Sequence, residues 1–217
     1  MTNTTRRSRR LLAARLAGYG FSIDPAEIIT AVMSGVALLR SRGVQRVAAY
    51  VAPETLEDFA GFDLQGTSPE AVVIGDLGEA WDFATLNRAF HQLMDGAVLL
   101  ALQRDRYWLK GDALALDAGP FVAALEYATG EAATLCGKPS AAFYGAALAT
   151  LPTAVAARPR DVVMIGDDVW GDVEGAQQAG LSAWMVRTGK FREEVVTSSG
   201  IAPDRIIESV AELPGLF

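Results

Sequence analysis

Thiol and imidazole side chains are almost absent from this 217-residue chain, which has one cysteine, Cys136, and one histidine, His91. A single cysteine cannot form a disulfide within the chain, which fits a reducing cytosol, so we expect a cytoplasmic protein. One histidine and one cysteine are too few for a zinc site or for cysteine–histidine catalysis. His91 follows Phe90 but lies off the apolar stripe of a predicted helix, so we expect it at the surface.

Long apolar runs and excess positive charge are also missing. No run approaches the ~18 residues that a membrane span needs, and the run at 97–102 has the length of a buried strand. The net charge of −7 disfavours binding to nucleic acid or to an anionic membrane, so we expect neither as a partner. The length is enough for one sizeable core, or for a core with a small second domain.

The N-terminal segment lacks acidic residues altogether: 1–23 contains five arginines and no Asp or Glu. This composition superficially resembles a transit peptide or a twin-arginine signal. However, no apolar signal core follows, and Arg6, Arg9 and Arg10 have the spacing of one helix face. We therefore interpret the segment as a helix with a solvated arginine face.

The pattern of apolar residues predicts an α/β fold. In the second half, short apolar strands alternate with helices, which is typical of a parallel sheet covered by helices. The pattern places strands at 47–51, 71–74, 97–102, 106–109, 133–136, 161–165 and 183–186, and helices at 6–17, 25–42, 85–94, 119–130, 140–150 and 170–179.

Three carboxylates gather at the end of one predicted strand. The apolar run 162–165 ends in Gly166, followed at once by Asp167 and Asp168, with Asp172 one helical turn further on. Ligands of open α/β sheets bind outside the carboxyl ends of the strands, and crowded carboxylates are stabilised by a hard cation such as Mg²⁺. The plainer reading, in which Asp168 caps a helix and Asp172 favours its dipole, does not explain Asp167.

A lysine stands in the equivalent position after the preceding strand. Lys138, in Gly137-Lys138-Pro139, would project from the same edge of the sheet, where its charge can neutralise a phosphate and a carboxylate. The tripeptide alone is also an ordinary turn. Its weight comes from its place one strand–helix unit before the acidic cluster.

Together, Lys138 and the Gly166–Asp168 segment with Asp172 resemble the third and fourth motifs of the haloacid-dehalogenase (HAD) phosphatases. Thr2-Asn3 resembles the second motif, whose hydroxyl and amide hold the transferring phosphoryl group. Segments at 119–129, 176–180 and 186–190 resemble the branch with an α/β cap that includes the phospholysine phosphohistidine inorganic pyrophosphate phosphatases. The resemblance covers essentially the whole chain.

The resemblance implies Mg²⁺-dependent hydrolysis of a small phosphate ester, phosphoramidate or pyrophosphate. Asp167 would ligate the metal, with Asp168 and Asp172 orienting it or its waters. Lys138 and Thr2 would hold the phosphoryl group, and Asn3 would support them. The partner is then a small phosphorylated substrate, and association into a homo-oligomer stays open.

The implied fold is a Rossmann-like HAD core at 1–43 and 133–217, with an inserted α/β cap at 44–132. The family's first motif is a buried strand ending in Asp-x-x-Gly-Thr, whose first Asp is the nucleophile, and the chain shows no such strand before Thr2. We therefore expect an incomplete core that lacks its N-terminal central strands. Asp63 begins an Asp-x-x-Gly-Thr sequence, but no apolar strand precedes it, so we interpret it as a decoy.

Three hypotheses follow. The chain is an active phosphatase shortened at its N-terminus and inactive as given, which we favour because the other motifs are intact. Alternatively, it is a non-catalytic module that binds Mg²⁺ and phosphate or a partner protein. In the third hypothesis, Asp63 is the nucleophile of a rearranged enzyme.

Overall fold

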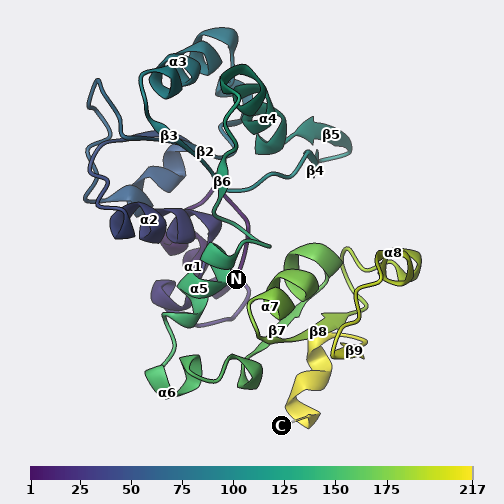
Figure 1. Cartoon of the computed structure of the whole chain (residues 1–217). Helices are drawn as coiled ribbons and strands as arrows, with labels where there is room; N and C mark the ends of the chain where they lie inside the picture. The colour runs from purple at the N-terminus through teal and green to yellow at the C-terminus, as the bar shows by residue number, and fades with distance from the viewer. Residues whose placement is uncertain (217) are drawn as a thin grey trace. The chain divides into compact units, whose positions relative to one another are not determined.

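The computed structural model describes residues 1–216 and divides into two compact units, Met1–Gly137 and Lys138–Phe217 (Figure 1). The predicted division into a core (1–43 and 133–217) and a cap (44–132) follows different boundaries. Residues 1–43 belong to the first unit by their packing, and the predicted division stays a prediction. In the described part of the chain, no helix is both long and apolar enough to cross a membrane.

The first unit is built on a four-stranded parallel sheet in the order β1-β2-β3-β6. Its strands are β1 (Val47–Tyr50), β2 (Ala71–Ile74), β3 (Val98–Ala101) and β6 (Thr134–Leu135). The register aligns Val47 with Ala71 and Ala71 with Val98. The strands start within two residues of the predicted positions because each is a short apolar run bounded by turn residues.

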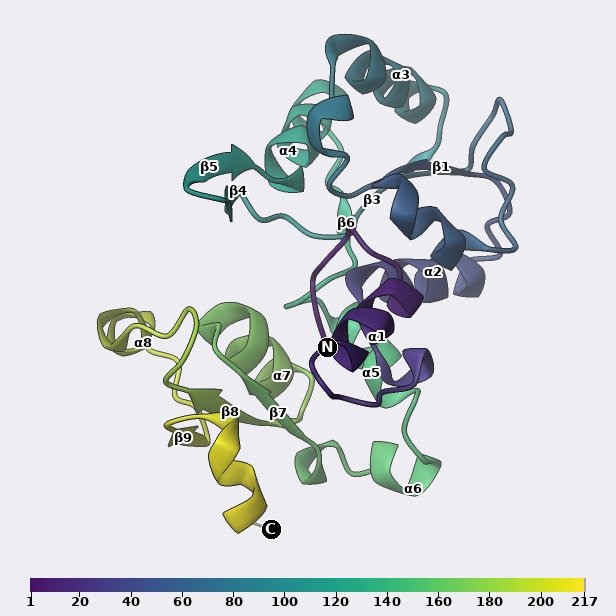
Figure 2. The ribbon, with the colours of Figure 1, turned by 180° about the vertical axis from the view of Figure 1, so that it is seen from behind.

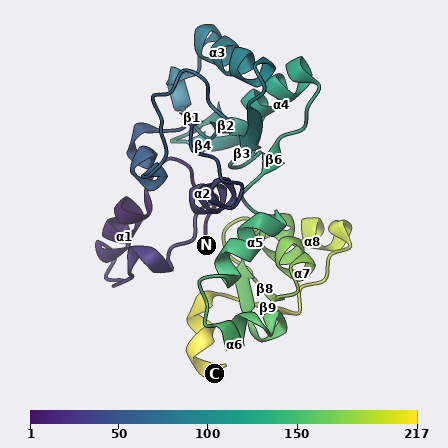
Figure 3. The same ribbon diagram turned by 60° about the vertical axis from the view of Figure 1, so that its left-hand side comes forward.

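Helices cover both faces of this sheet, as Figures 2 and 3 show from two directions. Helix α2 (Ala31–Ser41) packs on one face, where its Val36 and Leu39 join Val73 and Leu100 in one buried cluster. Helices α3 (Phe83–Met94) and α4 (Ala118–Thr129) pack on the other face against alternate residues such as Val72 and Ile74. This period-two alternation makes β2 a fully buried central strand.

The predicted helix at 25–42 is wrong in its first turn. Asp24 caps only a short 3₁₀ turn, η1 (Pro25–Glu27), and α2 begins after a second cap, Thr30. The residues between are extended because Thr2 pairs with them: its amide donates to the Ile29 carbonyl at 2.9 Å, and its carbonyl accepts from the Ala31 amide at 3.1 Å.

The predicted arginine face is wrong for Arg6. Helix α1 (Arg9–Ala17) begins after the cap Ser8, so Arg6 lies outside it. The three arginines that were assigned to the face form ion pairs with acids elsewhere in the first unit: Arg6 with Asp76, Arg9 with Asp58 and Arg10 with Glu57. These pairs are made at the surface, since the side chains of Arg6 and Arg10 are 45% and 66% exposed.

A β-hairpin interrupts the pattern between β3 and α4. Strand β4 (Tyr107–Lys110) was predicted, but its antiparallel partner β5 (Ala113–Leu116) was not. The turn between them contains Gly111 with φ +63°, and Gly-Asp between two apolar runs is the sequence signal that predicts such a hairpin.

The second unit has a three-stranded parallel sheet in the order β7-β8-β9, made of β7 (Val163–Gly166), β8 (Ser182–Val186) and β9 (Arg205–Ile207). Its helical segments are α5 (Ala141–Leu148), α6 (Thr153–Ala156), η4 (Pro159–Asp161), the π-helical η5 (Val169–Glu174), α7 (Gly175–Gln178), α8 (Glu193–Ser199) and η6 (Val210–Gly215). The Tyr144 hydroxyl of α5 donates to the carbonyls of Gly171 and Asp172, so these hydrogen bonds hold η5 against α5.

Candidate active site

Asp172 is the centre of a hydrogen-bonded cluster at the carboxyl end of β7. Its side chain is 5% exposed, and its Oδ1 lies 2.5 Å from the ammonium nitrogen of Lys138. Its Oδ2 accepts from the backbone amides of Asp167 and Asp168, at 3.1 Å each. One buried carboxylate therefore fixes both the lysine and the turn by which the chain leaves the strand.

Gly166 is required for this arrangement. A Cβ atom built at Gly166 would lie 2.1 Å from Asp172 Oδ2, far inside van der Waals contact. The carboxylate can reach the two amides only because the last residue of β7 has no side chain. Gly166, Asp167, Asp168 and Asp172 therefore depend on one another, because the missing side chain of Gly166 leaves space for the Asp172 carboxylate.

Lys138 is held mainly inside the protein, with 14% of its side chain exposed. Removing a lone ammonium from water is costly unless a counter-charge lies close by, and Asp172 supplies that charge. The pair fixes the ammonium in one place. A fixed cation at the carboxyl end of a parallel strand is suited to binding an anionic group.

Asp168 caps the helix that follows. Its Oδ1 accepts from the amides of Trp170 and Gly171, and its Oδ2 accepts from Lys190 Nζ at 2.9 Å. Burial acts to raise the pKa of Asp168, but the hydrogen bonds from Gly171 and Lys190 outweigh it, and the net pKa is lowered. The carboxylate is therefore ionised and committed to three donors.

Asp167 is less heavily bonded than its neighbours. Its Oδ2 accepts from the Lys190 amide at 2.8 Å, in a loop where Gly189 approaches so closely that a Cβ there would lie 1.9 Å from this oxygen. Within residues 1–216, Asp167 is the cluster carboxylate with the fewest donors on it. It is accordingly the best placed of the three to accept an external ligand.

The donor set determines which kind of metal site can form here. Within the described residues, no three Asp, Glu, His or Cys side chains form a group that could hold a metal ion by themselves. Mg²⁺ is commonly held by one or two carboxylates together with substrate phosphates and waters. The cluster fits that mode, with Asp167 as ligand, better than a cage of all three acids, because Asp168 and Asp172 already bind lysines and amides. The predicted metal assignment of the three acids stays a prediction.

The second-motif residues lie in the first unit. The Thr2 hydroxyl accepts from the Thr4 amide at 3.2 Å. Asn3 Oδ1 lies against Gly137, where an added Cβ would be 2.7 Å away. The roles predicted for Thr2 and Asn3 in holding a phosphoryl group stay predictions.

Asp63 is not placed like a nucleophile. Its backbone pairs with 45–47 at the amino end of β1, the opposite edge from the one where parallel sheets bind ligands. The Asp63 carboxylate accepts from the amides of Gln65 and Gly66 and so stabilises its own turn. The geometry supports the interpretation of Asp-x-x-Gly-Thr here as a decoy.

His91, Cys136 and Trp81 belong to the first unit. His91 is exposed, as predicted. Burial raises the pKa of the Cys136 thiol to about 12, so it is not a thiolate near neutral pH. Trp81 stacks between Tyr50 and Phe121, with ring centroids 5.6 and 4.7 Å away, which is core packing.

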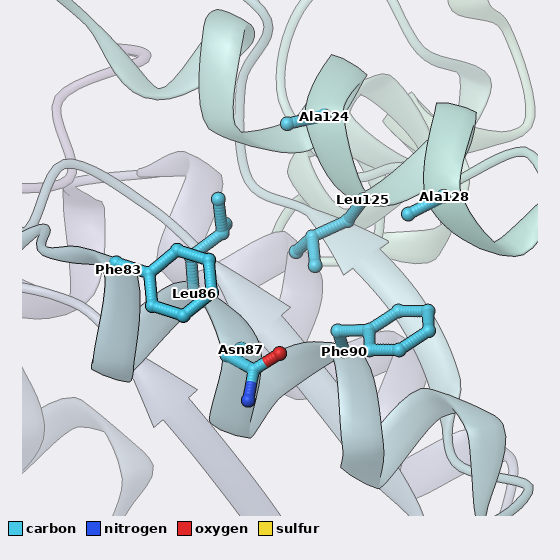
Figure 4. Close-up of a pocket in the computed structure, with 7 residues that line it drawn as sticks. All are labelled: Phe83, Leu86, Asn87, Phe90, Ala124, Leu125 and Ala128. Atoms are coloured by element: carbon cyan, nitrogen blue, oxygen red, sulfur yellow. The ribbon is translucent and has the colours of Figure 1, made fainter.

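An apolar groove of about 190 Å³ lies between α3 and α4 (Figure 4). It is lined mainly by Phe83, Leu86 and Phe90 on one side and by Leu125 on the other, and Asn87 is its only polar lining side chain. It contains no titratable group and offers no chemistry for phosphate.

Sequence comparisons connect the cluster with known proteins. Residues 135–213 match the protein family described as HAD-hydrolase-like. The haloacid dehalogenase-like hydrolase domain-containing protein 2 of Pongo abelii is 43% identical over 192 residues, which are 88% of this chain and 71% of that protein. The phospholysine phosphohistidine inorganic pyrophosphate phosphatase of Homo sapiens is 36% identical over 218 residues, covering 100% and 78%.

Solved structures agree on the fold. The p-nitrophenyl phosphatase from Archaeoglobus fulgidus superposes with a TM-score of 0.88 at 23% identity, over 99% of this chain and 84% of that one. The glycerol phosphate phosphatase from Mycobacterium tuberculosis, solved in complex with magnesium, gives 0.82 at 27% identity, over 97% and 65%. The α/β fold with parallel sheets is thus shared with these phosphatases.

Proposed function

The chain belongs to the haloacid dehalogenase-like hydrolases, and on that premise we propose that the cluster at 138–190 binds Mg²⁺ and the phosphoryl group of a small substrate for hydrolysis. The observation that carries the proposal is the buried Lys138–Asp172 pair at the carboxyl end of β7, with Asp167 beside it. Neither a helix cap nor a surface ion pair requires a lysine to be buried in this position.

Each residue then has a distinct task. Lys138 places a fixed positive charge against the phosphoryl oxygens, which is the main kind of stabilisation that phosphoryl transfer needs. Asp172 positions Lys138, and Asp168 holds the start of η5. Asp167 ligates Mg²⁺, which when bound would neutralise charge on the phosphoryl oxygens. The predicted role of Thr2 and Asn3 in holding a phosphoryl group stays a prediction.

The proposed substrate class is a small phosphate ester, phosphoramidate or pyrophosphate. The relatives and fold neighbours are named for phospholysine, phosphohistidine, pyrophosphate, p-nitrophenyl phosphate and glycerol phosphate, which supports small phosphorylated molecules in general. We propose a cytoplasmic location on the ground of the single buried cysteine.

We propose further that this 217-residue chain binds phosphate without turning it over. Phosphoryl transfer to an enzyme needs an attacking nucleophile, which the resemblance implies is an aspartate, and Asp63, which carries the matching sequence, is engaged in its own turn. The stabilising charges are present, whereas no residue in the cluster takes the role of the nucleophile.

Two measurements test these proposals. We expect calorimetric binding of orthophosphate in the presence of Mg²⁺, lost in Lys138→Met and weakened in Asp167→Asn, with Asp63→Asn as a control that binds normally. We also expect no hydrolysis of p-nitrophenyl phosphate above a blank that contains Mg²⁺ alone. Turnover that Asp167→Asn abolishes and Asp63→Asn leaves intact would show that another group attacks phosphorus.

A test on a longer chain distinguishes the proposed phosphatase from the alternative, a non-catalytic binding module. We expect an upstream extension with an apolar strand ending in Asp-x-x-Gly-Thr to confer turnover that depends on Asp167 and Lys138. Phosphate binding without turnover in such an extended chain would favour the binding module instead.

A further inference from the structure

A second lysine reaches the cluster from the loop after β8. Lys190 Nζ lies 2.9 Å from Asp168 Oδ2, and the Lys190 amide donates to Asp167 Oδ2 at 2.8 Å. One residue therefore contacts both adjacent acids, with its main chain on one and its side chain on the other. Sequence patterns alone did not single out Lys190 as a site residue.

The loop that presents Lys190 is held firmly. Gly189 has φ +62°, a backbone conformation that suits glycine. The Arg192 guanidinium donates to the carbonyls of Gly189 and Phe191, at 3.2 and 2.6 Å, and Arg187 stacks on the Phe191 ring at 5.0 Å. The position of Lys190 is thus set by several independent contacts within the second unit.

The two lysines differ in their access to solvent. The side chain of Lys138 is 14% exposed, whereas that of Lys190 is 66% exposed. The ammonium of Lys138 is therefore largely screened from water, whereas that of Lys190 faces it. We infer that a substrate whose phosphoryl group binds Lys138 extends toward the exposed Lys190.

We propose that Lys190 is a specificity-determining residue that binds a second anionic group of the substrate, and that the preferred substrate class is a diphosphate such as pyrophosphate. This inference rests on the proposed function of the same cluster. An ammonium has three N–H donors, so a lysine bonded to Asp168 can also donate to a substrate oxygen. A neutral leaving group would gain nothing from this lysine.

The chemistry favours this role over simple neutralisation of Asp168. The amides of Trp170 and Gly171 already stabilise that carboxylate from the other oxygen. Charge-assisted hydrogen bonds to phosphate are roughly twice as strong as neutral ones. A lysine fixed beside Asp167 therefore adds selectivity for substrates with charge beyond the first phosphoryl group.

The test compares two probes, orthophosphate and pyrophosphate, by calorimetry on the full chain with saturating Mg²⁺. We expect pyrophosphate to bind about tenfold or more tightly than orthophosphate, because a charge-assisted contact is of that order. Lys190→Met should lower this selectivity ratio at least tenfold, and Lys190→Arg, which keeps the charge, should restore most of it. Arg160→Met removes an equal charge at the amino end of β7 and should leave the ratio unchanged.

The outcomes separate the two levels of the proposal. If orthophosphate does not bind, or binds equally in Lys138→Met, the proposed function fails and the inference with it. If orthophosphate binding requires Lys138 but Lys190→Met weakens both probes equally, or neither, only the inference is overturned. Circular dichroism of both Lys190 variants excludes loss of the fold as the cause.

Discussion

Two strands of this protein end in the same way and are used differently. Strand β2 runs into Ile74-Gly75-Asp76, and strand β7 ends in Ile165-Gly166 followed by Asp167. Both are apolar parallel strands, and both present an aspartate just beyond the carboxyl end. From the local sequence pattern alone, either aspartate could indicate a phosphate or metal site.

The surroundings of the two aspartates separate them. Asp76 is 5% exposed, its carboxylate accepts from Arg6 and from the Gly78 amide, and its own backbone amide donates to the Thr5 hydroxyl oxygen. Its side-chain donors are one guanidinium and one amide of its own turn, and the acid Asp117 lies close enough to interact with it electrostatically. The Asp167 cluster differs in its cations, because two lysines bind the acids Asp172 and Asp168 there.

The two strands also differ in burial and in the number of strands that pair with them. All four residues of β2 are buried between β1 and β3, whereas β7, in the described structure, pairs with β8 alone and is only partly buried. A strand followed by glycine and aspartate therefore specifies a position at the carboxyl end of a sheet. Residues far along the chain decide whether that position is structural or chemical.

The largest effect that distinguishes the two sites should come from their glycines. Gly166→Ala places a Cβ 2.1 Å from Asp172 Oδ2, while Gly75→Ala meets side-chain atoms of Val51, Leu102 and Thr5 at 3.1–3.2 Å. We expect Gly166→Ala to lower the free energy of unfolding by about 4 kcal/mol, since overpacking adds to a broken buried pair. Gly75→Ala should cost about 1 kcal/mol. Urea denaturation measures both, and equal losses would contradict the comparison.

The next effect concerns the cations. Lys138→Met leaves Asp172 buried without its counter-charge and should lower the free energy of unfolding by about 3 kcal/mol. Arg6→Met is the matched change at Asp76. Because Arg6 is 45% exposed, water can replace it, and about 1 kcal/mol is expected. A larger loss for Arg6→Met in thermal or urea unfolding would reverse our ranking of the two sites.

Hydrogen exchange should show the difference between the strands directly. We expect the amides of β2 to exchange at least about tenfold more slowly than those of β7, because β2 has paired neighbours on both sides and opens only with the core of its unit. Mass spectrometry of peptides covering 71–74 and 163–166 makes the measurement. Equal protection would mean that β7 is covered by a partner in solution.

The smallest effect is the pH dependence of one carboxylate in each unit. Burial raises the pKa of Asp117 beside Asp76 and Asp105, whereas the Ala183 amide lowers the pKa of Asp204. As pH falls through the raised pKa, the folded state takes up the proton first, so wild type should gain stability relative to Asp117→Asn. The contribution of Asp204 is present above its unfolded pKa and should be lost at lower pH, so the advantage over Asp204→Asn should shrink. Unfolding measured from pH 7 to 3 checks both directions, and parallel curves would refute them.

Several features of the fold could be predicted because they depend on short stretches of sequence. The bounds 71–74 of β2 follow from an apolar run between turn residues, and the structure confirms them. The break before α2 could not, because it depends on Thr2 pairing with Ile29 and Ala31, a contact that no local pattern reveals. Strand β9, at 205–207, is only three residues long and gives no periodic signal.

The candidate site could likewise be predicted only where it depends on local sequence. Spacing predicted that Lys138 and the acids Asp167, Asp168 and Asp172 share one strand edge. It could not show that Asp172 binds Lys138 while Asp168 binds Lys190, because hydrogen-bond partners depend on tertiary geometry. A Thr-Gly-Lys sequence directly after β8 was the available signal for Lys190, since the carboxyl end of the adjacent parallel strand must reach the same edge.

The aromatic residues add a practical consequence. The chain has four tryptophans, and Trp170 lies within the cluster sequence, 53% exposed, with its amide bonded to Asp168. Trp184 faces the Arg205 guanidinium at 5.0 Å in β8, and Trp81 is stacked in the first unit. Because the backbone of Trp170 is bonded to Asp168, its emission should change when an ion or phosphate arrives, so intrinsic fluorescence offers a label-free optical titration of this site, with Trp170→Phe as the spectroscopic blank.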